Sequence, residues 1–134
     1  MAFKSKHVEI IENAEIKFLP EEIVHIHYLA GNNYTLDQNK AIFEKVTALT
    51  KLKKARILIS GGDFVTHDAE ATKYNASADV MERCSAVAMI TQELADRLVA
   101  NFFMKFYKPL APVRFFSKQE DAIAWLQKFK NTEN

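Results

Sequence analysis

The fold of this chain is decided by the stretch from Ala55 to Ala78, ARILISGGDFVTHDAEATKYNASA. Its apolar run predicts a buried strand at Ile57–Ser60, the Gly61-Gly62 pair predicts a turn, and the residues beyond predict a helix from about His67 to Arg83. α/β domains usually place a functional site where a strand crosses into a helix. The sequence therefore directs attention to this turn.

The same signals place the other elements along the chain. Alternating apolar and polar residues on either side of Pro20-Glu21 predict an antiparallel hairpin, and apolar residues at helical spacing predict the helices. In chain order, we expect strands at Ala14–Leu19 and Glu22–Leu29, a helix from Thr35 or Asp37 to Thr50, a strand at Ser85–Ile90, a helix at Thr91–Phe106, a strand at Val113–Phe116 and a helix at Ser117–Phe129, with Val8–Ile11 suited to a further short strand.

These elements predict an α/β fold in the order β-β-α-β-α-β-α-β-α. Strands that alternate with helices imply right-handed crossovers, and hence a mixed, mostly parallel sheet with an antiparallel edge and about four helices. The chain has 134 residues with no internal repeat and no linker, so we expect a single domain over residues 1–134. Residues 1–7 and 131–134 are polar and are expected to fray.

The charge balance of the sequence argues against two classes of partner. Eighteen Lys and Arg stand against seventeen Asp and Glu, for a net charge of +1, which gives no field that would attract nucleic acid or an anionic membrane. The basic run Lys51–Arg56 falls where a helix is expected to end, and cations are favoured there. One cysteine, Cys84, together with the lack of a secretory leader or an apolar span, indicates a cytoplasmic protein with no membrane span.

The C-terminal segment carries a pattern that resembles a known class of proteins. A motif of the form F-S-x-x-E-x-A-x-x-W-L is made by Phe116, Ser117, Glu120, Ala122, Trp125 and Leu126. Together with the hairpin and the β-α alternation, it resembles small bacterial proteins of the STAS-like class, which are relatives of the anti-sigma-factor antagonists and include STAS/SEC14 domain proteins. The motif is structural, so the resemblance implies a fold more than a function.

The resemblance also implies a candidate regulatory residue. In the antagonist family, a serine or threonine at the start of the second helix is phosphorylated by a partner kinase, and the added charge blocks docking to that partner. The corresponding turn here runs over Gly61–Ala69, where Thr66 is the only hydroxyl and Asp68 the nearest carboxylate. His67-Asp68 replaces the Ser-Gly that follows the acceptor in the family. The alternative is that Thr66 only caps the helix.

Other constellations are weaker as functional signals. His25 and His27 are two apart on a strand, so both imidazoles face one side, but no third ligand accompanies them and a solvated or subunit-facing role is expected rather than a metal site. The Gly61-Gly62 pair lacks the P-loop and dinucleotide fingerprints. Cys84 is expected to be a small core residue. No catalytic set emerges, and no cofactor is expected.

These observations lead to a regulatory or protein-interaction module without catalytic activity, capable of forming a homodimer. Its expected working surface contains Gly62, Asp63, Thr66, His67 and Asp68, with an interface or pocket wall near Phe103, Lys105 and Tyr107. The alternative is a small-ligand carrier for a lipid or nucleotide, suggested by the STAS/SEC14 resemblance and the surplus aromatics. An enzyme using His67 and Asp68 ranks third.

Overall fold

The computed structural model describes residues 8–91 and 110–133 of the chain. Its elements follow in the order β1 (Val8–Ile11), β2 (Ala14–Phe18), β3 (Val24–Tyr28), β4 (Asn33–Tyr34), α1 (Leu36–Thr50), β5 (Leu52–Gly61), β6 (Thr66–His67), α2 (Ala69–Asn75), α3 (Ala78–Met81), β7 (Cys84–Ile90), β8 (Val113–Phe116), α5 (Gln119–Leu126) and β9 (Thr132–Glu133). The predicted helix at Thr91–Phe106 lies almost entirely outside the described residues.

The main sheet has the strand order β1-β2-β3-β5-β7-β8, with β9 paired to β5. The hairpin strands β1, β2 and β3 are antiparallel, whereas β3, β5, β7 and β8 are mutually parallel. This arrangement confirms the predicted mixed, mostly parallel α/β sheet with an antiparallel edge. The short strands β4 and β6 form a separate parallel pair, which the sequence did not indicate.

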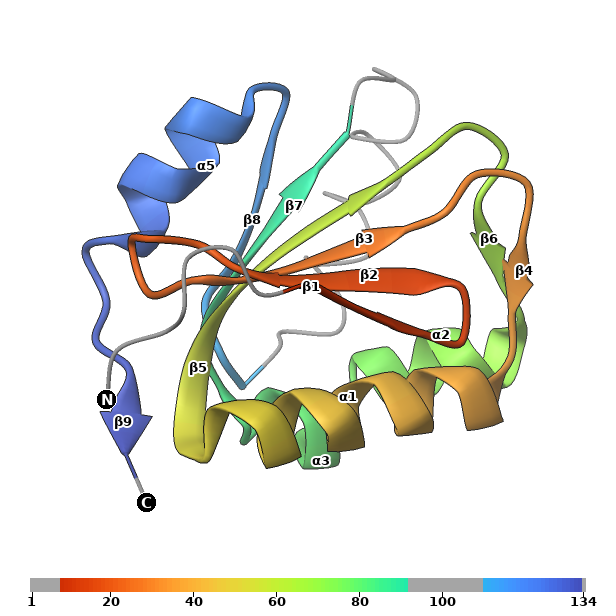
Figure 1. Ribbon diagram of the computed structural model, residues 1–134, viewed down its shortest axis with the longest axis horizontal. Helices are drawn as coiled ribbons and strands as arrows, with labels where there is room; N and C mark the ends of the chain where they lie inside the picture. The colour runs from red at the N-terminus through yellow and green to blue at the C-terminus, as the bar shows by residue number, and fades with distance from the viewer. Residues whose placement is uncertain (1–7, 92–109, 134) are drawn as a thin grey trace.

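Helices cover the sheet on both faces. Figure 1 shows α1, α2 and α3 on one side of the sheet and α5 on the other. The first side buries a cluster that includes Ile26, Ile57 and Val46, and the second buries a smaller cluster that includes Leu58 and Leu126. Both faces of the central part of β5 are covered, which agrees with its apolar run Ile57, Leu58 and Ile59 without alternation.

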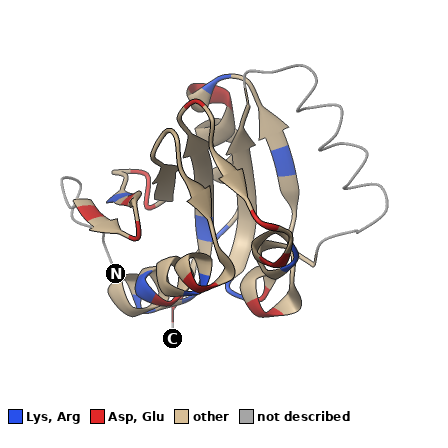
Figure 2. Cartoon of the chain, turned by 90° about the vertical axis from the view of Figure 1, so that its right-hand side faces the viewer, with Lys and Arg blue, Asp and Glu red and all other residues tan. Residues whose placement is uncertain are grey.

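Charges are distributed over the described chain without separation by sign. Figure 2 shows basic and acidic segments interspersed on helices and strands, in agreement with the near balance of the sequence. Within residues 8–91 and 110–133, no helix is both long enough and apolar enough to cross a membrane.

Helix α1 is capped by Thr35, the first of the two candidates Thr35 and Asp37. Thr35 is the N-cap, and its hydroxyl accepts a hydrogen bond from the Gln38 backbone N–H while the Gln38 side chain accepts one from the Thr35 N–H. This capping box satisfies two amide groups that the first helical turn leaves without partners. The buried residues Ile42, Phe43 and Val46 then face the sheet, as the helical spacing predicted.

The helix predicted from about His67 to Arg83 is divided into α2 and α3. The hydroxyl of Ser77 donates to the Tyr74 carbonyl at 2.5 Å and accepts from the Val80 N–H at 3.4 Å. A serine that bonds the local backbone in this way ends one helix and begins the next. The last helix also begins later than expected, because Lys118 rather than Ser117 is its N-cap.

Strand β5 begins five residues earlier than the predicted Ile57. Lys51 ends α1 in the left-handed conformation, with φ of 55°, and its N–H donates to the Thr47 carbonyl. The chain reverses there and enters the sheet at Leu52. The basic run Lys51–Arg56 therefore lies mostly in a strand and not at a helix end.

The C-terminal tail is held by the sheet, so the prediction that residues 131–134 fray is wrong for 131–133. Thr132 and Glu133 form β9, which pairs antiparallel with Lys54 and Leu52. The pairing supplies partners for backbone groups at the start of β5, which extends beyond its parallel neighbours. The sequence did not indicate this strand, because both side chains of β9 are exposed and polar and so show no apolar pattern.

Candidate functional site

The segment after β5, residues 61–68, forms a loop that we call the β5–α2 loop. Backbone hydrogen bonds join this loop to the end of β3 and to the segment that follows it. The Gly62 N–H donates to the Tyr28 carbonyl and the Gly31 N–H donates to the Asp63 carbonyl, each at 2.9 Å. The β4–β6 pair then continues the connection. The loop is therefore positioned by the backbone of its parallel neighbour.

Gly62 allows the two segments to approach closely. A Cβ atom at Gly62 would lie 2.7 Å from the Ala30 Cβ and 3.0 Å from the Ala30 backbone N and Cα atoms. Backbone atoms cannot move aside at low cost, so only glycine fits. At Gly61 the nearest atom would be a Val65 methyl group at 3.5 Å, which is ordinary contact.

The loop packs through His67 against a buried cluster of polar and aromatic side chains. Asn39, fully buried on α1, accepts a hydrogen bond from the Tyr28 hydroxyl at 2.8 Å and lies 3.3 Å from His67 Nδ1. The His67 and Tyr34 rings both contact the Tyr28 ring with centroids 4.7 Å apart. Burial lowers the pKa of His67 and raises that of Tyr28. His67 is thus a neutral support for the loop.

Phe64 is the residue that the cluster does not support. Its side chain is 88% exposed and its backbone has φ of 62°. A bulky residue in the left-handed region is uncommon, because its Cβ crowds the following carbonyl oxygen. Phe64 therefore gains neither burial nor a favourable backbone conformation from the fold. The sequence did not indicate Phe64 as a functional residue, since a left-handed φ at a non-glycine residue has no signature in the sequence.

Asp68, and not Thr66, caps the helix that follows the loop. Asp68 is the N-cap of α2, and its carboxylate accepts a hydrogen bond from the Ala71 N–H at 2.8 Å. The alternative that Thr66 caps this helix is therefore wrong. Thr66 lies in β6 with an exposed side chain, and its hydroxyl donates to Asn33 Oδ1 at 2.8 Å.

The five predicted residues Gly62, Asp63, Thr66, His67 and Asp68 belong to this one loop, but they do not form one surface. Asp63 and Thr66 are exposed, whereas Gly62, His67 and Asp68 are partly buried and act on the backbone or the cluster beneath. The other predicted residues, Phe103, Lys105 and Tyr107, lie outside the described part of the chain.

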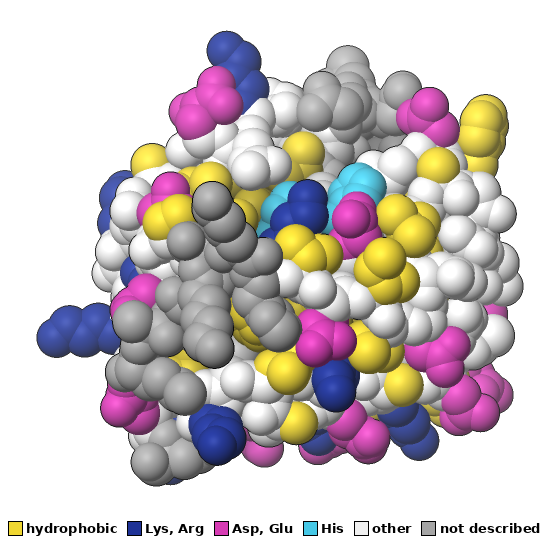
Figure 3. Space-filling view, viewed as in Figure 1, with side chains coloured by type: hydrophobic (Ala, Val, Ile, Leu, Met, Phe, Trp, Pro, Cys, Tyr) yellow, Lys and Arg dark blue, Asp and Glu magenta, His cyan; other side chains and the backbone are white. Residues whose placement is uncertain are grey.

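A second polar group lies on the opposite face of the sheet from α1. His25 Nε2 and His27 Nδ1 are each 2.7 Å from Ser60 Oγ, which confirms that the two imidazoles share a face. Figure 3 shows histidine side chains at the surface over β3, beside basic and acidic groups. The sequence could not place Ser60 between them, because the register of a parallel pair is not visible in either strand. No cluster of metal-ligating side chains occurs in residues 8–91 and 110–133.

His25 is held neutral by its surroundings. It is only 7% exposed, so the expectation of a solvated or subunit-facing residue is wrong for it. Burial is the main effect that lowers its pKa to about 4, and the positive charges of Lys17 and of a protonated His27 act in the same direction. Cys84 is also buried, and burial raises the pKa of its thiol to about 12, which suits the predicted core role.

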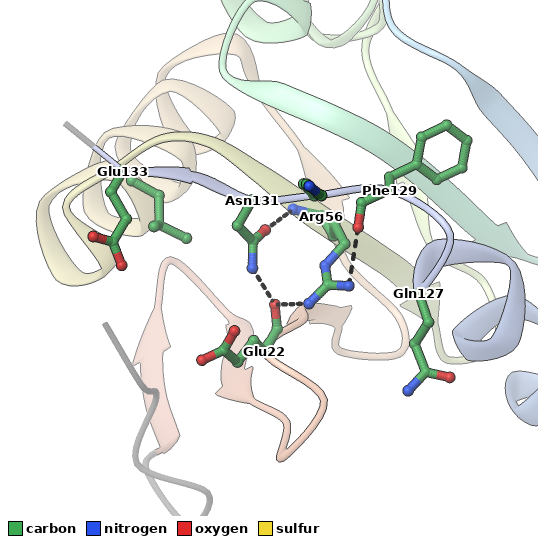
Figure 4. Close-up of a pocket in the computed structure, with 8 residues that line it drawn as sticks. Glu22, Arg56, Gln127, Phe129, Asn131 and Glu133 are labelled. Atoms are coloured by element: carbon green, nitrogen blue, oxygen red, sulfur yellow. Dashed lines mark hydrogen bonds between the residues drawn. The ribbon is translucent and has the colours of Figure 1, made fainter.

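A pocket of about 360 Å³ lies at the other end of β5 (Figure 4). Arg56, almost fully buried, donates from its guanidinium to the carbonyl oxygens of Phe129 at 3.1 Å, Glu21 at 2.7 Å and Glu22 at 3.3 Å. The Asn131 side chain accepts from the Arg56 N–H and donates to the Glu22 carbonyl. These bonds join the C-terminal tail to the β2–β3 turn. The pocket is lined by Glu22, Leu52, Arg56, Gln127, Phe129, Lys130, Asn131 and Glu133.

Both signs of charge line this pocket, so it does not resemble an apolar cavity that would hold a lipid. The terminal nitrogens of the Arg56 guanidinium are already engaged with backbone carbonyls. We assign it a structural role in fastening the tail.

Comparison with known proteins gives a family and a fold. Residues 17–130 match the family described as Domain of unknown function (DUF7793), and the chain belongs to this family. No curated protein matches it. An uncharacterized protein of the DUF3478 family from Shewanella loihica PV-4, which has a SpoIIAA-like fold, is similar in structure with a TM-score of 0.63 and 16% identity, over 92% of this chain and 98% of that chain. The fold is SpoIIAA-like, which confirms the predicted STAS-like class.

Substitution of Gly62 by alanine tests the close approach at the loop. We expect Gly62→Ala to lower the free energy of unfolding by about 1–3 kcal/mol, because the new methyl group would overlap the Ala30 backbone. Gly61→Ala is the matched control and should leave stability nearly unchanged. Urea unfolding of both variants measures the difference, and equal losses would contradict the assigned contact.

Substitution of Arg56 by lysine tests the fastening of the tail. A lysine ammonium cannot reproduce the planar set of bonds to three carbonyl groups. We expect Arg56→Lys to lower the free energy of unfolding by about 2 kcal/mol. Arg114→Lys, at an exposed position of β8, should change it by less than about 0.5 kcal/mol. A similar stability for both variants would show that the Arg56 bonds contribute nothing.

The pH dependence of unfolding tests the burial of neutral His25. Its pKa is lowered from 6.5 to about 4 in the folded protein, so the unfolded chain binds the proton more readily. The stabilisation is fully present above about pH 6.5 and is lost as the pH falls toward 4. Between about pH 7 and about pH 5, His25 alone should lower the free energy of unfolding by about 2 kcal/mol. Chemical unfolding should show a shallower pH dependence in His25→Gln, and an unchanged slope would refute this assignment.

Proposed function

We propose that this member of the DUF7793 family is a regulatory or protein-interaction module, and that its β5–α2 loop binds a protein partner through Phe64. The observation that carries the proposal is the combination of 88% exposure and a φ of 62° at an aromatic residue. The left-handed conformation costs a non-glycine residue about 1–2 kcal/mol. Such strain at an exposed residue supports a role other than folding stability.

The contacts that hold the loop in one conformation favour binding of a partner. Gly62, Asp63 and His67 are each connected to neighbouring segments by the contacts described above. A loop already held in one conformation loses little conformational entropy when a partner binds. An exposed aromatic side chain on such a base is a typical binding anchor.

Thr66 is the proposed regulatory residue, as the resemblance to the antagonist family implies. Its hydroxyl is exposed and bonded only to Asn33 among the described residues. A phosphoryl group would remove the donor of that bond and add negative charge close to Asp63 and Asp68. Phosphorylation would therefore disturb the loop beside Phe64 and weaken docking.

Position-specific cross-linking tests the proposal in cells that naturally produce the protein. A photoreactive phenylalanine analogue at position 64 should give one discrete adduct, while the same analogue at Lys53, exposed on β5, should not. Excess unmodified protein should compete for the adduct, whereas excess Phe64→Asn protein should compete at least about 30-fold less well, as loss of a binding anchor of about 2 kcal/mol predicts.

The Phe64→Asn variant also distinguishes a loss of binding from a loss of stability. Asparagine tolerates the left-handed region, so Phe64→Asn should unfold with an unchanged free energy or one higher by up to about 1 kcal/mol. Thr66→Glu should reduce the adduct if the regulatory role is correct. Absence of an adduct at position 64, or equal adducts at both positions, would contradict the proposed binding surface.

A further inference from the structure

Ser60 lies between two imidazoles on the face of the sheet that α1 does not cover. Its Oγ is 2.7 Å from His25 Nε2 and 2.7 Å from His27 Nδ1. A hydroxyl carries one proton, so one of these nitrogens accepts that proton and the other donates an N–H to the oxygen. The arrangement gives Ser60 a base and a hydrogen-bond donor at the same time.

The neighbouring strand β2 distinguishes the two histidines. Glu15 is directly opposite His27, and Lys17 is directly opposite His25, so each pair shares a face with Cβ atoms about 4.5–5.5 Å apart. The carboxylate favours a positive charge that forms on His27, and the ammonium opposes one on His25. Burial acts against protonation of His25 as well, because it lowers the pKa of that imidazole. His27 is therefore the proton acceptor and His25 the donor.

We propose that Ser60 is a nucleophile that accepts an acyl group from an activated ester, with His27 as general base, His25 as N–H donor to Oγ and Glu15 as a positioning residue. This inference goes beyond the proposed function, because it needs neither Phe64 nor a protein partner.

The proposed step is balanced by the residues and the ester alone. Ser60 Oγ attacks the carbonyl carbon and its proton passes to His27 Nδ1. The bond between the acyl carbon and the leaving oxygen then breaks, and the proton on His27 is transferred to that oxygen. The products are acyl-Ser60 and an alcohol.

The surroundings indicate the class of ester. Val8 and Ile10 on β1 are opposite Lys17 and Glu15, and they are 48% and 65% exposed. Apolar surface therefore lies on the same face as the polar group, which suits an apolar acyl or aryl group. The ammonium of Lys17, opposite His25, supplies positive charge on this face.

The alternative is that Ser60 only satisfies two imidazole nitrogens. Treatment of the full chain with an alkyl fluorophosphonate and, separately, with p-nitrophenyl hexanoate distinguishes the two roles. With the fluorophosphonate, a bond from Oγ to phosphorus forms and fluoride leaves. Peptide mass spectrometry of the wild-type protein then locates the adduct, so the assignment does not depend on a variant that folds.

We expect both reagents to label Ser60 and the label to be absent when the chain is unfolded in urea. His27→Gln should slow labelling about 10²-fold or more, as expected for loss of a general base. Thr72→Ala, at an exposed position of α2, is the matched hydroxyl control and should label at the wild-type rate. A folded His27→Gln protein that labels as fast as the wild type would overturn the proposal.

The rate of labelling tests Glu15. Glu15 is directly opposite His27 on β2, so Glu15→Gln should slow labelling of Ser60, whereas Glu15→Asp, which keeps the carboxylate, should restore most of the rate. Glu44→Gln, exposed on α1, should leave it unchanged. Labelling that is absent from Ser60 in the folded wild-type protein would refute the nucleophile itself.

Discussion

The parallel pairing of β3 with β5 is the constraint on which the rest of the structure depends. It joins the antiparallel hairpin to the parallel half of the sheet, with Val24 opposite Ile57 and Tyr28 opposite Gly61. This register brings Ser60 opposite His27 and directs the chain from Gly61 into the β5–α2 loop. A shift by one residue would move every side chain of β5 to the other face. The two functional surfaces that we propose both follow from this single register.

Hydrogen bonds of two different buried polar residues hold the two ends of this strand pair. At the carboxyl end, the fully buried Asn39 connects α1 to the Tyr28 hydroxyl and to His67. At the amino end, Arg56 connects β5 to carbonyl groups of the β2–β3 turn and of the tail. Buried polar groups are stabilising only when they have partners. Asn39 and the terminal nitrogens of Arg56 have them, whereas Arg56 Nε is buried without a hydrogen-bond partner among the described residues.

Some residues meet a local requirement of the folded backbone, and others do not. Gly62, Asp68 and Thr35 each meet a local requirement of the backbone, through close approach or helix capping. Phe64 meets none, and its exposure and backbone conformation both oppose its presence. Departures from local consistency are expected mainly at functional positions. Glu12, Asn13, Glu22 and Lys51 also have a left-handed φ, but among the described residues only Phe64 combines it with a large, exposed apolar side chain, and this combination separates the β5–α2 loop from the other turns.

Local patterns in the sequence determined the class of the fold, the hairpin, the strands at Ser85–Ile90 and Val113–Phe116 and the start of the first helix near Thr35 or Asp37, because alternation, apolar runs and capping depend on neighbours in the chain. They also placed the turn at Gly61-Gly62. Only the tertiary structure decided that Ser60 lies between His25 and His27, that Asp68 rather than Thr66 caps α2, and that β9 holds the tail against β5. These features arise from strand register and from contacts between residues as many as 109 positions apart in the sequence. Such contacts have no local signal, since their free energy appears only when distant segments are brought together.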